Sequence, residues 1–512
     1  RTMANFQSIL FDDEVAPAQS VGQPAFFGDL NLDQVVDAIT APKQDYELKP
    51  FFYQLPQRLE TIFYRHEVMR DLDNEAMMTA IHDFAEQMVI ARRYLRLVEK
   101  LYDPHHKRGW FLEAALVYCQ AVLTLQQRLD AVSFTARGWQ AFIEYLREYV
   151  ASIQFQTLLN EARSVRQSLD EVSYCLTLHN NGTVRVRRHE DESDYSVDVT
   201  QTFARFQQGA VKDYRLNLQY SGMNHIEAQI LELVVRLFPH PFAELERFCQ
   251  QHPDFMDERI ETFDREVQFY VAYLQFIADM RQKGLPFCYP EMTQQRGDSF
   301  VEQGFDLALA YQLLYRSTPT VCNDFFLQGD ERVLVVTGPN QGGKTTFARM
   351  FGQLHYLARL GCLLPGRRAR LFFFDQLFTH FEREEDMRNL RGKLHDDLLR
   401  IHEILTQATP NSLIILNEIF ASTTLKDALF LSQEIMRRVS ELDLQGVWVT
   451  FMDELATYNE KTVSMLSTVD ADNPAERTFR ILRRPADGLA YALSLAEKHR
   501  LTYQQIQERI QP

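Results

Sequence analysis

Hydrophobic positions divide the chain into stretches with different spacing. Residues 1–50 carry scattered Pro and Gly and little periodicity, so we expect a loosely structured lead-in with one short helix near residues 32–39. From residue 56 to about residue 171, apolar residues recur every three or four positions in long runs with few internal Gly or Pro, and this spacing resumes at 226–237 and 260–280. This spacing is typical of long amphipathic helices.

The helical spacing is interrupted once. Residues 172–178 (VSYCLTL) and 183–187 (TVRVR) alternate in character around an Asn-Gly turn, which predicts a β-hairpin. A third strand is expected at 195–199, after an acidic run. The pattern therefore predicts a β insertion at about 172–208, between long helices.

The last third of the chain has a different pattern again. Short apolar runs alternate with helical segments there, and they lie at 333–337, 371–374, 413–416 and 447–450. Such alternation predicts a largely buried sheet covered by helices, which is an α/β domain.

Composition and charge narrow the possible functions. The chain has 512 residues, 46% of them hydrophobic and 24% charged, which is ordinary for globular proteins and predicts several domains. Its formal net charge is −16, so any nucleic acid must be bound by local basic patches against the overall charge. We expect neither a signal peptide nor a membrane helix. Six scattered cysteines without a Cys-x-x-Cys pair favour a reducing cytoplasm over disulfides or zinc.

Residues 338–345 read GPNQGGKT and fit the pattern G-x-x-x-x-G-K-[ST] between a predicted strand and a predicted helix. In that context the glycines let backbone N–H groups converge on a phosphate, and the helix N-terminus adds partial positive charge. The lysine can reach the β- and γ-phosphates of ATP, and the hydroxyl after it can bind Mg²⁺. The predicted cofactor-binding residues are Gly338, Pro339, Asn340, Gln341, Gly342, Gly343, Lys344, Thr345 and Thr346. The alternative is a glycine-rich turn that fits by chance.

A second segment, LIILNE at 413–418, is an apolar strand that ends in polar residues. Such a strand end orients Mg²⁺ and the attacking water in P-loop ATPases. The metal site is then predicted at Thr345 and Asn417, with Glu418 nearby, and the catalytic residues are Glu418 and Lys344. Asn417 stands where an Asp is usual, and an uncharged amide should weaken Mg²⁺ binding and slow turnover. The alternative for Glu418 is a surface acid at a strand end.

Several segments resemble the MutS family. Residues 337–346, TGPNQGGKTT, are similar to its Walker A motif, TGPNxGGK[ST]. Further blocks resemble MutS motifs in the same order, and they are VCND at 321–324, FDQLFT at 374–379, EIFASTT at 418–424, WVTFMDEL at 448–455 and GLAYALSLA at 488–496. The resemblance therefore extends over most of the last third of the chain.

The resemblance implies a multidomain fold. After the lead-in at 1–50, an all-α helical core and lever domain is expected at 51–284, with the β insertion where the family has its DNA-gripping clamp. An α/β P-loop ATPase domain of the ABC type follows at 285–512 and ends in a helical dimerisation segment. Relatives of this kind form homodimers with two composite ATP sites, and here Asn323 should lie near the adenine. ATP would close the dimer around branched or duplex DNA in DNA repair or recombination control.

The sequence also departs from the family pattern. Phe451 replaces the switch His, and Gly392 stands where the family offers a serine to the partner's nucleotide, although Lys393 could substitute as a cation. No counterpart of the Phe-x-Glu mismatch-reading motif is found, since FFGD at 26–29 does not match it. The expectation is slow ATP hydrolysis and DNA selected by its shape rather than by a mismatch wedge.

Three arginines near the predicted hairpin tip, Arg185, Arg187 and Arg188, are candidates for DNA backbone binding. The alternative is a solvated strand face, followed at once by acidic residues that cancel its charge. A rival function is an ATP-gated protein- or RNA-binding switch with little DNA affinity, which the acidic net charge and the short insertion favour.

Overall fold

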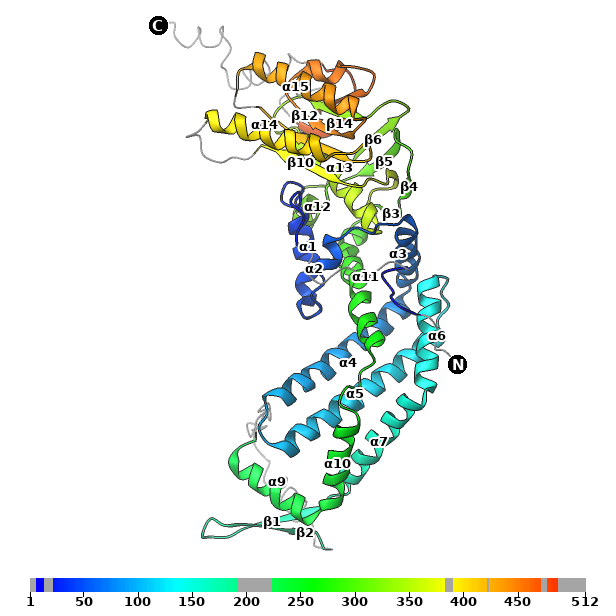
Figure 1. Cartoon of the computed structure of the whole chain (residues 1–512), viewed down its shortest axis with the longest axis vertical. Helices are drawn as coiled ribbons and strands as arrows, with labels where there is room; N and C mark the ends of the chain where they lie inside the picture. The colour runs from blue at the N-terminus through cyan, green and yellow to red at the C-terminus, as the bar shows by residue number, and fades with distance from the viewer. Residues whose placement is uncertain are drawn as a thin grey trace, which may run out of the picture. The chain divides into compact units, whose positions relative to one another are not determined.

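A computed structural model of the chain describes residues 6–12, 22–190, 223–382, 390–420, 423–470 and 477–486 (Figure 1). Its contacts divide the chain into two compact units. The first comprises Arg1–Gln7 with Asp71–Asp264, and the second comprises Ser8–Arg70 with Arg265–Pro512. Among the helices of the described residues, none combines the length and the apolarity that a membrane span requires.

The first unit consists mainly of helices, as the apolar spacing predicts. They are α4 (Glu75–Lys100), α5 (Pro104–Asp130), α6 (Arg137–Ala151), α7 (Ile153–Asp170), α9 (His225–Leu237), α10 (Pro239–Gln251) and the start of α11 (Glu258–Gln282). Asn74 and Asp103 cap the first turns of α4 and α5 through their side-chain oxygens. Aromatic packing forms part of the core, where the Phe142 ring stacks on the Phe263 ring with centroids 3.5 Å apart.

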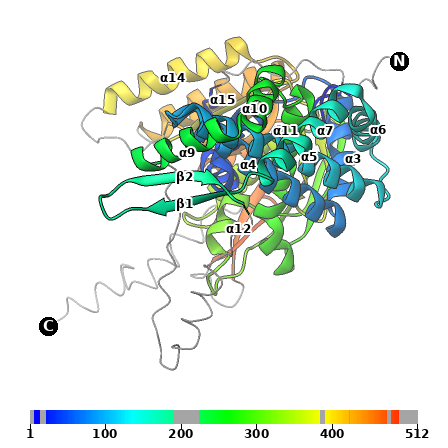
Figure 2. The same ribbon diagram turned by 90° about the horizontal axis from the view of Figure 1, so that it is seen from below.

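The predicted hairpin is present in this unit. Strand β1 (Tyr174–Leu178) pairs antiparallel with β2 (Val184–Arg188), and the turn contains Gly182 at φ +79°. Strand β2 lies along α9 (Figure 2). The expected third strand at 195–199 lies outside the described residues.

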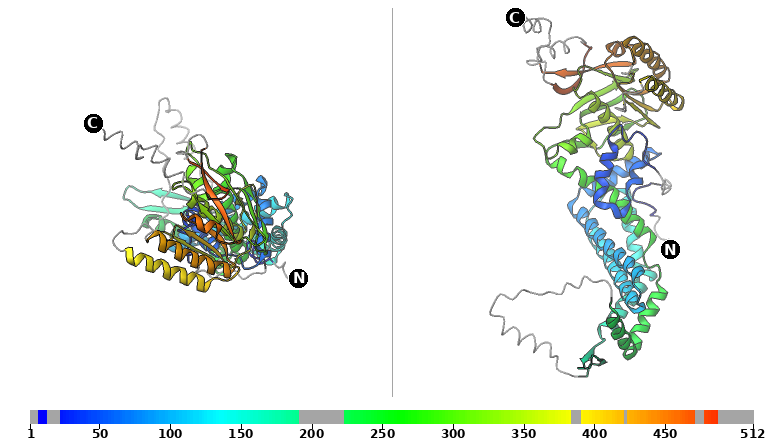
Figure 3. Two further views of the ribbon diagram at one scale, coloured as in Figure 1. Left: turned by 90° about the horizontal axis from the view of Figure 1, so that it is seen from above. Right: turned by 90° about the vertical axis from the view of Figure 1, so that its left-hand side faces the viewer.

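The second unit contains a six-stranded sheet, which the last third of the sequence predicts. Its order is β10 (Leu377–Phe381), β11 (Leu413–Asn417), β12 (Gln445–Val449), β7 (Val333–Thr337), β13 (Thr462–Val469) and β14 (Arg477–Arg483). Only β14 runs antiparallel. Helix α13 (Lys344–Leu360) packs on β11 and β12. Helices α14 (Leu390–Gln407) and α15 (Leu425–Glu441) share an apolar core with the sheet and lie near one another (Figure 3).

A smaller sheet accompanies the main one. It contains β4 (Glu291–Thr293), β9 (Arg368–Phe372), β5 (Asp298–Gly304) and β6 (Asn323–Gln328), and the pair β3 (Phe287–Cys288) and β8 (Leu364–Pro365) lies beside β9. Helix α12 (Leu307–Leu313) contacts α13, and the 3₁₀ turn η2 (Asp453–Thr457) contacts β7 and β13 of the main sheet.

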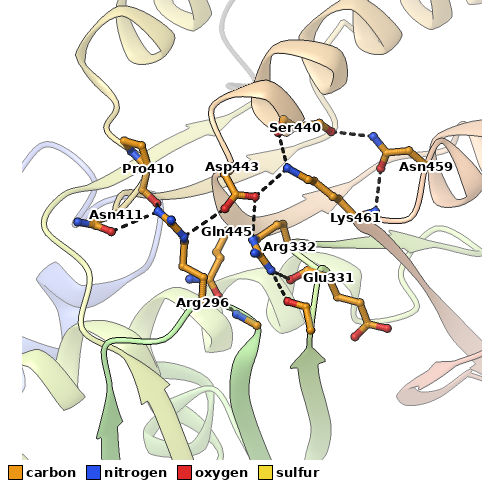
Figure 4. Close-up of polar contacts among 12 residues, drawn as sticks. Arg296, Glu331, Arg332, Pro410, Asn411, Ser440, Asp443, Gln445, Asn459 and Lys461 are labelled. Carbon is orange, nitrogen blue, oxygen red and sulfur yellow. Dashed lines mark hydrogen bonds and ion pairs between the residues drawn. The ribbon is translucent and has the colours of Figure 1, made fainter.

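Asp443 joins the two sheets at the edge where the parallel strands begin (Figure 4). Its carboxylate accepts hydrogen bonds from Arg332 Nε at 2.9 Å and Lys461 Nζ at 2.8 Å, and these residues precede β7 and β13. Arg296, between β4 and β5, places its Nε 3.1 Å from the same carboxylate. Three cations on one carboxylate therefore connect the small sheet to the start of the main sheet.

The lead-in is more ordered than the sequence predicts. The short helix is confirmed as α1 (Leu32–Thr40), and it is followed by η1 (Ala41–Tyr46), α2 (Lys49–Tyr53) and α3 (Leu59–Leu72). Phe27, Leu30 and Phe52 are fully buried. The expected boundaries at 50 and 284 also differ from those of the compact units. Most of α3 and the later part of α11 belong to the second unit, where Arg65 donates to the carbonyl of Leu360 and Tyr273 donates to that of Leu363. Tertiary burial explains both the order of the lead-in and the shifted boundaries. The spacing of Pro and Gly in residues 1–50 does not reveal that burial.

Residues 8–11 are buried or nearly buried in the second unit, and side chains from later segments form hydrogen bonds with their backbone. Glu266 accepts hydrogen bonds from Ser8 Oγ at 2.6 Å and Ile9 N at 3.0 Å. The Tyr64 and Tyr270 hydroxyls donate to the carbonyls of Ser8 and Ile9. Burial raises the pKa of Glu266 to about 7, although the hydrogen bonds from Ser8 and Ile9 oppose the rise.

This pKa predicts a pH-dependent stability. A carboxyl whose pKa is about 7 when folded and near 4.5 when unfolded stabilises the fold below pH 4.5, and it loses that contribution as the pH rises towards 7. As the pH rises from 4.5 to 7.5, we expect the thermal unfolding midpoint of the wild type to decrease relative to that of Glu266→Gln, as measured by scanning calorimetry. Other titrating groups cancel in this comparison. If the unfolding midpoints of the wild type and of Glu266→Gln change with pH in parallel, the pKa of Glu266 is not raised.

Candidate functional site

The loop of residues 338–343 joins β7 to α13 and takes a shape that glycine permits. Gly338 has φ +115° and Gly343 has φ +89°, in the region that side chains rarely adopt. A Cβ atom on Gly338 would lie 2.9 Å from the backbone oxygen of Ser467. The conformation of this loop therefore requires the glycines at 338 and 343, which favours a P-loop over a turn that fits the motif by chance.

Ser467 on β13 packs against the loop and bonds to its backbone. It is fully buried, and its Oγ donates a hydrogen bond of 2.7 Å to the carbonyl of Gly342. A Cβ atom on Gly342 would lie 2.2 Å from that Oγ. Sequence reasoning missed Ser467, because only the parallel pairing of β13 with β7 brings it to the loop.

Lys344 at the start of α13 is almost completely buried, with 4% of its side chain exposed. Its ammonium donates to the carbonyls of Gly338 and Pro339, both at 3.1 Å, and lies 3.6 Å from Glu418 Oε1. Burial lowers the pKa of Lys344, and the Glu418 carboxylate opposes that change. The structure thus holds a cation in the loop among oxygen atoms.

Asn417 and Glu418 lie at the edge of the sheet where β7 also ends. The Thr345 hydroxyl donates to Asn417 Oδ1 at 3.1 Å, so the two predicted metal ligands lie side by side. Glu418 has φ +52°, a left-handed conformation that costs about 1 kcal/mol or more for a residue with a side chain. Two neighbouring oxygen donors beside a carboxylate suit Mg²⁺, which prefers oxygen ligands.

A pocket of about 600 Å³ opens over these residues. Eight predicted site residues line it, namely Asn323, Asn340, Gln341, Gly343, Lys344, Thr345, Thr346 and Glu418. Its remaining wall is largely apolar and was not predicted, and it consists of Leu309, Leu313, Thr318, Pro319, Val321 and Phe479. These side chains come from α12, from the segment after it and from β14, so no local pattern links them to the loop.

Asn323 lines this pocket, but its side-chain amide is engaged with β14. Its Nδ2 donates to the carbonyl of Phe479 at 3.2 Å, and its Oδ1 accepts from Ile481 N at 2.7 Å. The ring of Phe479, about half exposed, belongs to the pocket wall beside Gly343. Asn323 therefore holds the strand that carries this aromatic ring.

Other candidate residues lie elsewhere. Phe451 follows β12 with 46% of its surface exposed, and neither it nor Gly392 on α14 lines the pocket. The three arginines belong to β2 of the other compact unit. There Arg188 Nε donates to the carbonyl of Leu237 at 3.1 Å, and its guanidinium lies over the Phe238 ring. That arginine is thus tied to the end of α9.

The strand β7, the glycine loop and helix α13 form a P-loop, a backbone arrangement that can cradle phosphates. The main sheet places one strand, β12, between the loop-bearing β7 and the strand β11 that ends in Asn417. Comparison with known families agrees with the motifs, because residues 334–502 match MutS domain V. Residues 334–502 are thus similar to a MutS domain, and this match covers about a third of the chain.

Curated relatives named DNA mismatch repair protein MutS are similar over part of the chain. The protein from Shouchella clausii is 30% identical over 247 residues, which are 46% of this chain and 28% of the relative. The one from Halalkalibacterium halodurans is 32% identical over 182 residues, 35% of this chain and 21% of the relative. The one from Geobacillus kaustophilus is 31% identical over 182 residues, with 35% and 20% covered. The matched region is thus less than a third of each relative's length.

The contact between Ser467 and the loop predicts an effect on nucleotide binding. Ser467→Ala leaves the Gly342 carbonyl without its donor, and a lost hydrogen bond of this kind costs about 1 kcal/mol. We expect the Kd for an ATP analogue, measured by calorimetry, to rise about fivefold. Ser464→Ala is the matched control, because Ser464 lies on the same strand and bonds to Arg484 instead. Equal effects of both variants would contradict the assignment.

Proposed function

We propose that this chain is a MutS-like ATPase that binds and hydrolyses ATP and uses the cycle to control a dimeric DNA-binding clamp. The observation that carries the proposal is the convergence of Lys344, Thr345 and Glu418 on one pocket at the end of the parallel strands, where Asn417 accepts a hydrogen bond from Thr345. The family match supports the same chemistry.

ATP binding follows from the groups that face the pocket. The loop at 338–343 and the N-terminus of α13 offer backbone N–H groups and partial positive charge to phosphates. Lys344 would exchange its present carbonyl and carboxylate partners for phosphate oxygens, which are stronger acceptors. The apolar wall with Phe479 is the part of the pocket that suits a flat base, and Asn323 keeps that wall in place.

Hydrolysis requires charge stabilisation and an oriented water molecule. Lys344 stabilises negative charge on the phosphates, and Glu418 is the only carboxylate among the residues lining the described pocket, so it orients the water. Thr345 and Asn417 would hold Mg²⁺, which offsets phosphate charge when it is bound. Because Asn417 supplies no charge and Phe451 supplies no polar group, we propose that turnover is slow.

The DNA-binding part of the proposal rests on the hairpin and on the relatives, whose name assigns them to DNA mismatch repair. Strand pairing places Arg185 opposite Thr177 and Arg187 opposite Cys175, so the two arginines share one face of the hairpin. Both are exposed, as phosphate contacts require. Arg188 lies on the other face and anchors α9. We propose branched or duplex DNA as the ligand of this face.

The assembly proposed is a homodimer with two composite ATP sites in the cytoplasm, where the reduced cysteines are stable. Each site would be completed by the partner subunit near α14, the helix that contains Gly392 and Lys393.

Two variants separate ATP binding from ATP hydrolysis. Glu418→Gln keeps the size of the side chain but removes the charge that orients water, so we expect at least a hundredfold loss of kcat with ATP still bound. Lys344→Ala should also weaken binding, because it removes the cation among the loop carbonyls. Phosphate release and analogue binding measure the two steps. Normal turnover in either variant would place the active site elsewhere.

The arginines predict a salt-dependent interaction with DNA. Each lost phosphate contact reduces the slope of log K against log salt by about 0.9. Arg185→Gln with Arg187→Gln should therefore reduce that slope by nearly 2 on junction or duplex DNA. Arg236→Gln is the control, since Arg236 on α9 pairs with Glu232 at 2.6 Å.

The same titration is repeated with structured RNA. An unchanged DNA slope in the double variant, or tighter binding of RNA than of DNA by the wild type, would favour the rival switch that does not act on DNA.

A further inference from the structure

A turn at residues 25–31, just before α1, packs against the elements that form the proposed ATP site. Its Leu30 side chain meets α13 at Gly352, where an added Cβ would lie 2.7 Å from a Leu30 methyl carbon. The Gln353 side chain donates to the Leu30 carbonyl at 2.8 Å, and Arg349 Nε donates to the Asp29 carbonyl at 3.0 Å. The backbone of this turn is thus bound to the helix that begins at Lys344.

The Asp29 side chain contacts two other elements. Its Oδ2 accepts a hydrogen bond of 2.6 Å from Thr379 on β10 and lies 3.4 Å from Arg400 Nη2 on α14. Arg400 also donates to the Thr379 carbonyl at 3.0 Å. Only 12% of the Asp29 side chain is exposed, so this small network is largely shielded from water.

Helix α14 and the segment that carries Glu418 contribute side chains to one buried apolar cluster. Ile401 and Ile404 of α14 belong to the same buried cluster as Ile419 and Phe420, the two residues after Glu418. Glu418 and Phe420 both have positive φ, so the conformation of this segment depends on its packing. Asp29 is therefore paired with Arg400 on α14, and α14 shares a buried apolar cluster with the two residues that follow Glu418.

We propose that Asp29 is a positioning residue of the ATPase site, acting through Arg400 and α14 on Glu418. This inference rests on the proposed ATPase function and adds a component from the N-terminal part of the chain. It assigns the turn at 25–31 a role in turnover rather than in nucleotide affinity, because the P-loop contacts of Lys344 and Thr345 do not involve the Asp29 carboxylate.

The substitution Asp29→Asn isolates this role. The amide keeps an oxygen that can accept from Thr379, and the backbone contact with Arg349 is unchanged, but the charge opposite Arg400 is lost. We expect kcat for ATP to fall three- to tenfold while KM and the Kd of an ATP analogue change less than twofold. The amides of α14 should also exchange faster with deuterium.

A double-mutant cycle tests the path. If Asp29 acts through Arg400, the combination of Asp29→Asn with Arg400→Gln should lower kcat no further than Arg400→Gln alone. Asp37→Asn is the matched control, because Asp37 lies on α1 and pairs with Lys49 at 2.6 Å. It should leave kcat and the exchange of α14 unchanged.

The outcomes separate this inference from the proposed function. If wild-type protein hydrolyses ATP and Asp29→Asn matches it in kcat and in α14 exchange, the inference is wrong and the ATPase assignment stands. An equal loss in analogue affinity would also overturn it, because that result indicates a general structural role. If wild-type protein does not hydrolyse ATP, the proposed function fails, and unchanged exchange in α14 then refutes the structural link separately.

Discussion

The need to compensate one buried cation constrains the candidate site. Lys344 is almost completely withdrawn from water, and an ammonium in that position requires oxygen partners. The loop supplies two backbone carbonyls only because glycines at 338 and 343 let it curl around the side chain. Glu418 supplies the negative charge from the neighbouring region of the sheet, at the cost of a left-handed backbone. Phosphate oxygens can take the place of these carbonyl and carboxylate oxygens as partners of the Lys344 ammonium.

The local parts of this arrangement could be predicted from the sequence, and the nonlocal parts could not. The spacing of glycine, lysine and threonine in residues 338–345 carries its own mechanism, and the apolar strand before Asn417 is a local pattern. Ser467 reaches the loop and Phe479 reaches the pocket only through the pairing of strands more than a hundred residues further along the chain, so no local signal marks them. The spacing of Pro and Gly in residues 1–50 hid an ordered segment, because its stability comes from tertiary burial.

The three arginines of the hairpin do not occupy equivalent positions. Three arginines in residues 185–188 look alike in the sequence, but strand alternation places Arg188 on the opposite face from Arg185 and Arg187. Its guanidinium satisfies the last carbonyl of α9 and stacks on Phe238, which makes it part of the framework. A net charge of −16 is therefore compatible with a small basic face, provided the interaction remains local.

The hydrogen bonds from Ser8 and Ile9 to Glu266 span 258 and 257 positions along the chain. During synthesis on the ribosome, residues 8–70 emerge long before the residues with which they pack. They must therefore wait, with Phe27, Leu30 and Phe52 exposed, until the later segment has been made. Contacts of such sequence separation are slow to form, because a long loop must first be closed. In the cell, the yield of active protein should thus depend on chaperones that shield these early apolar residues.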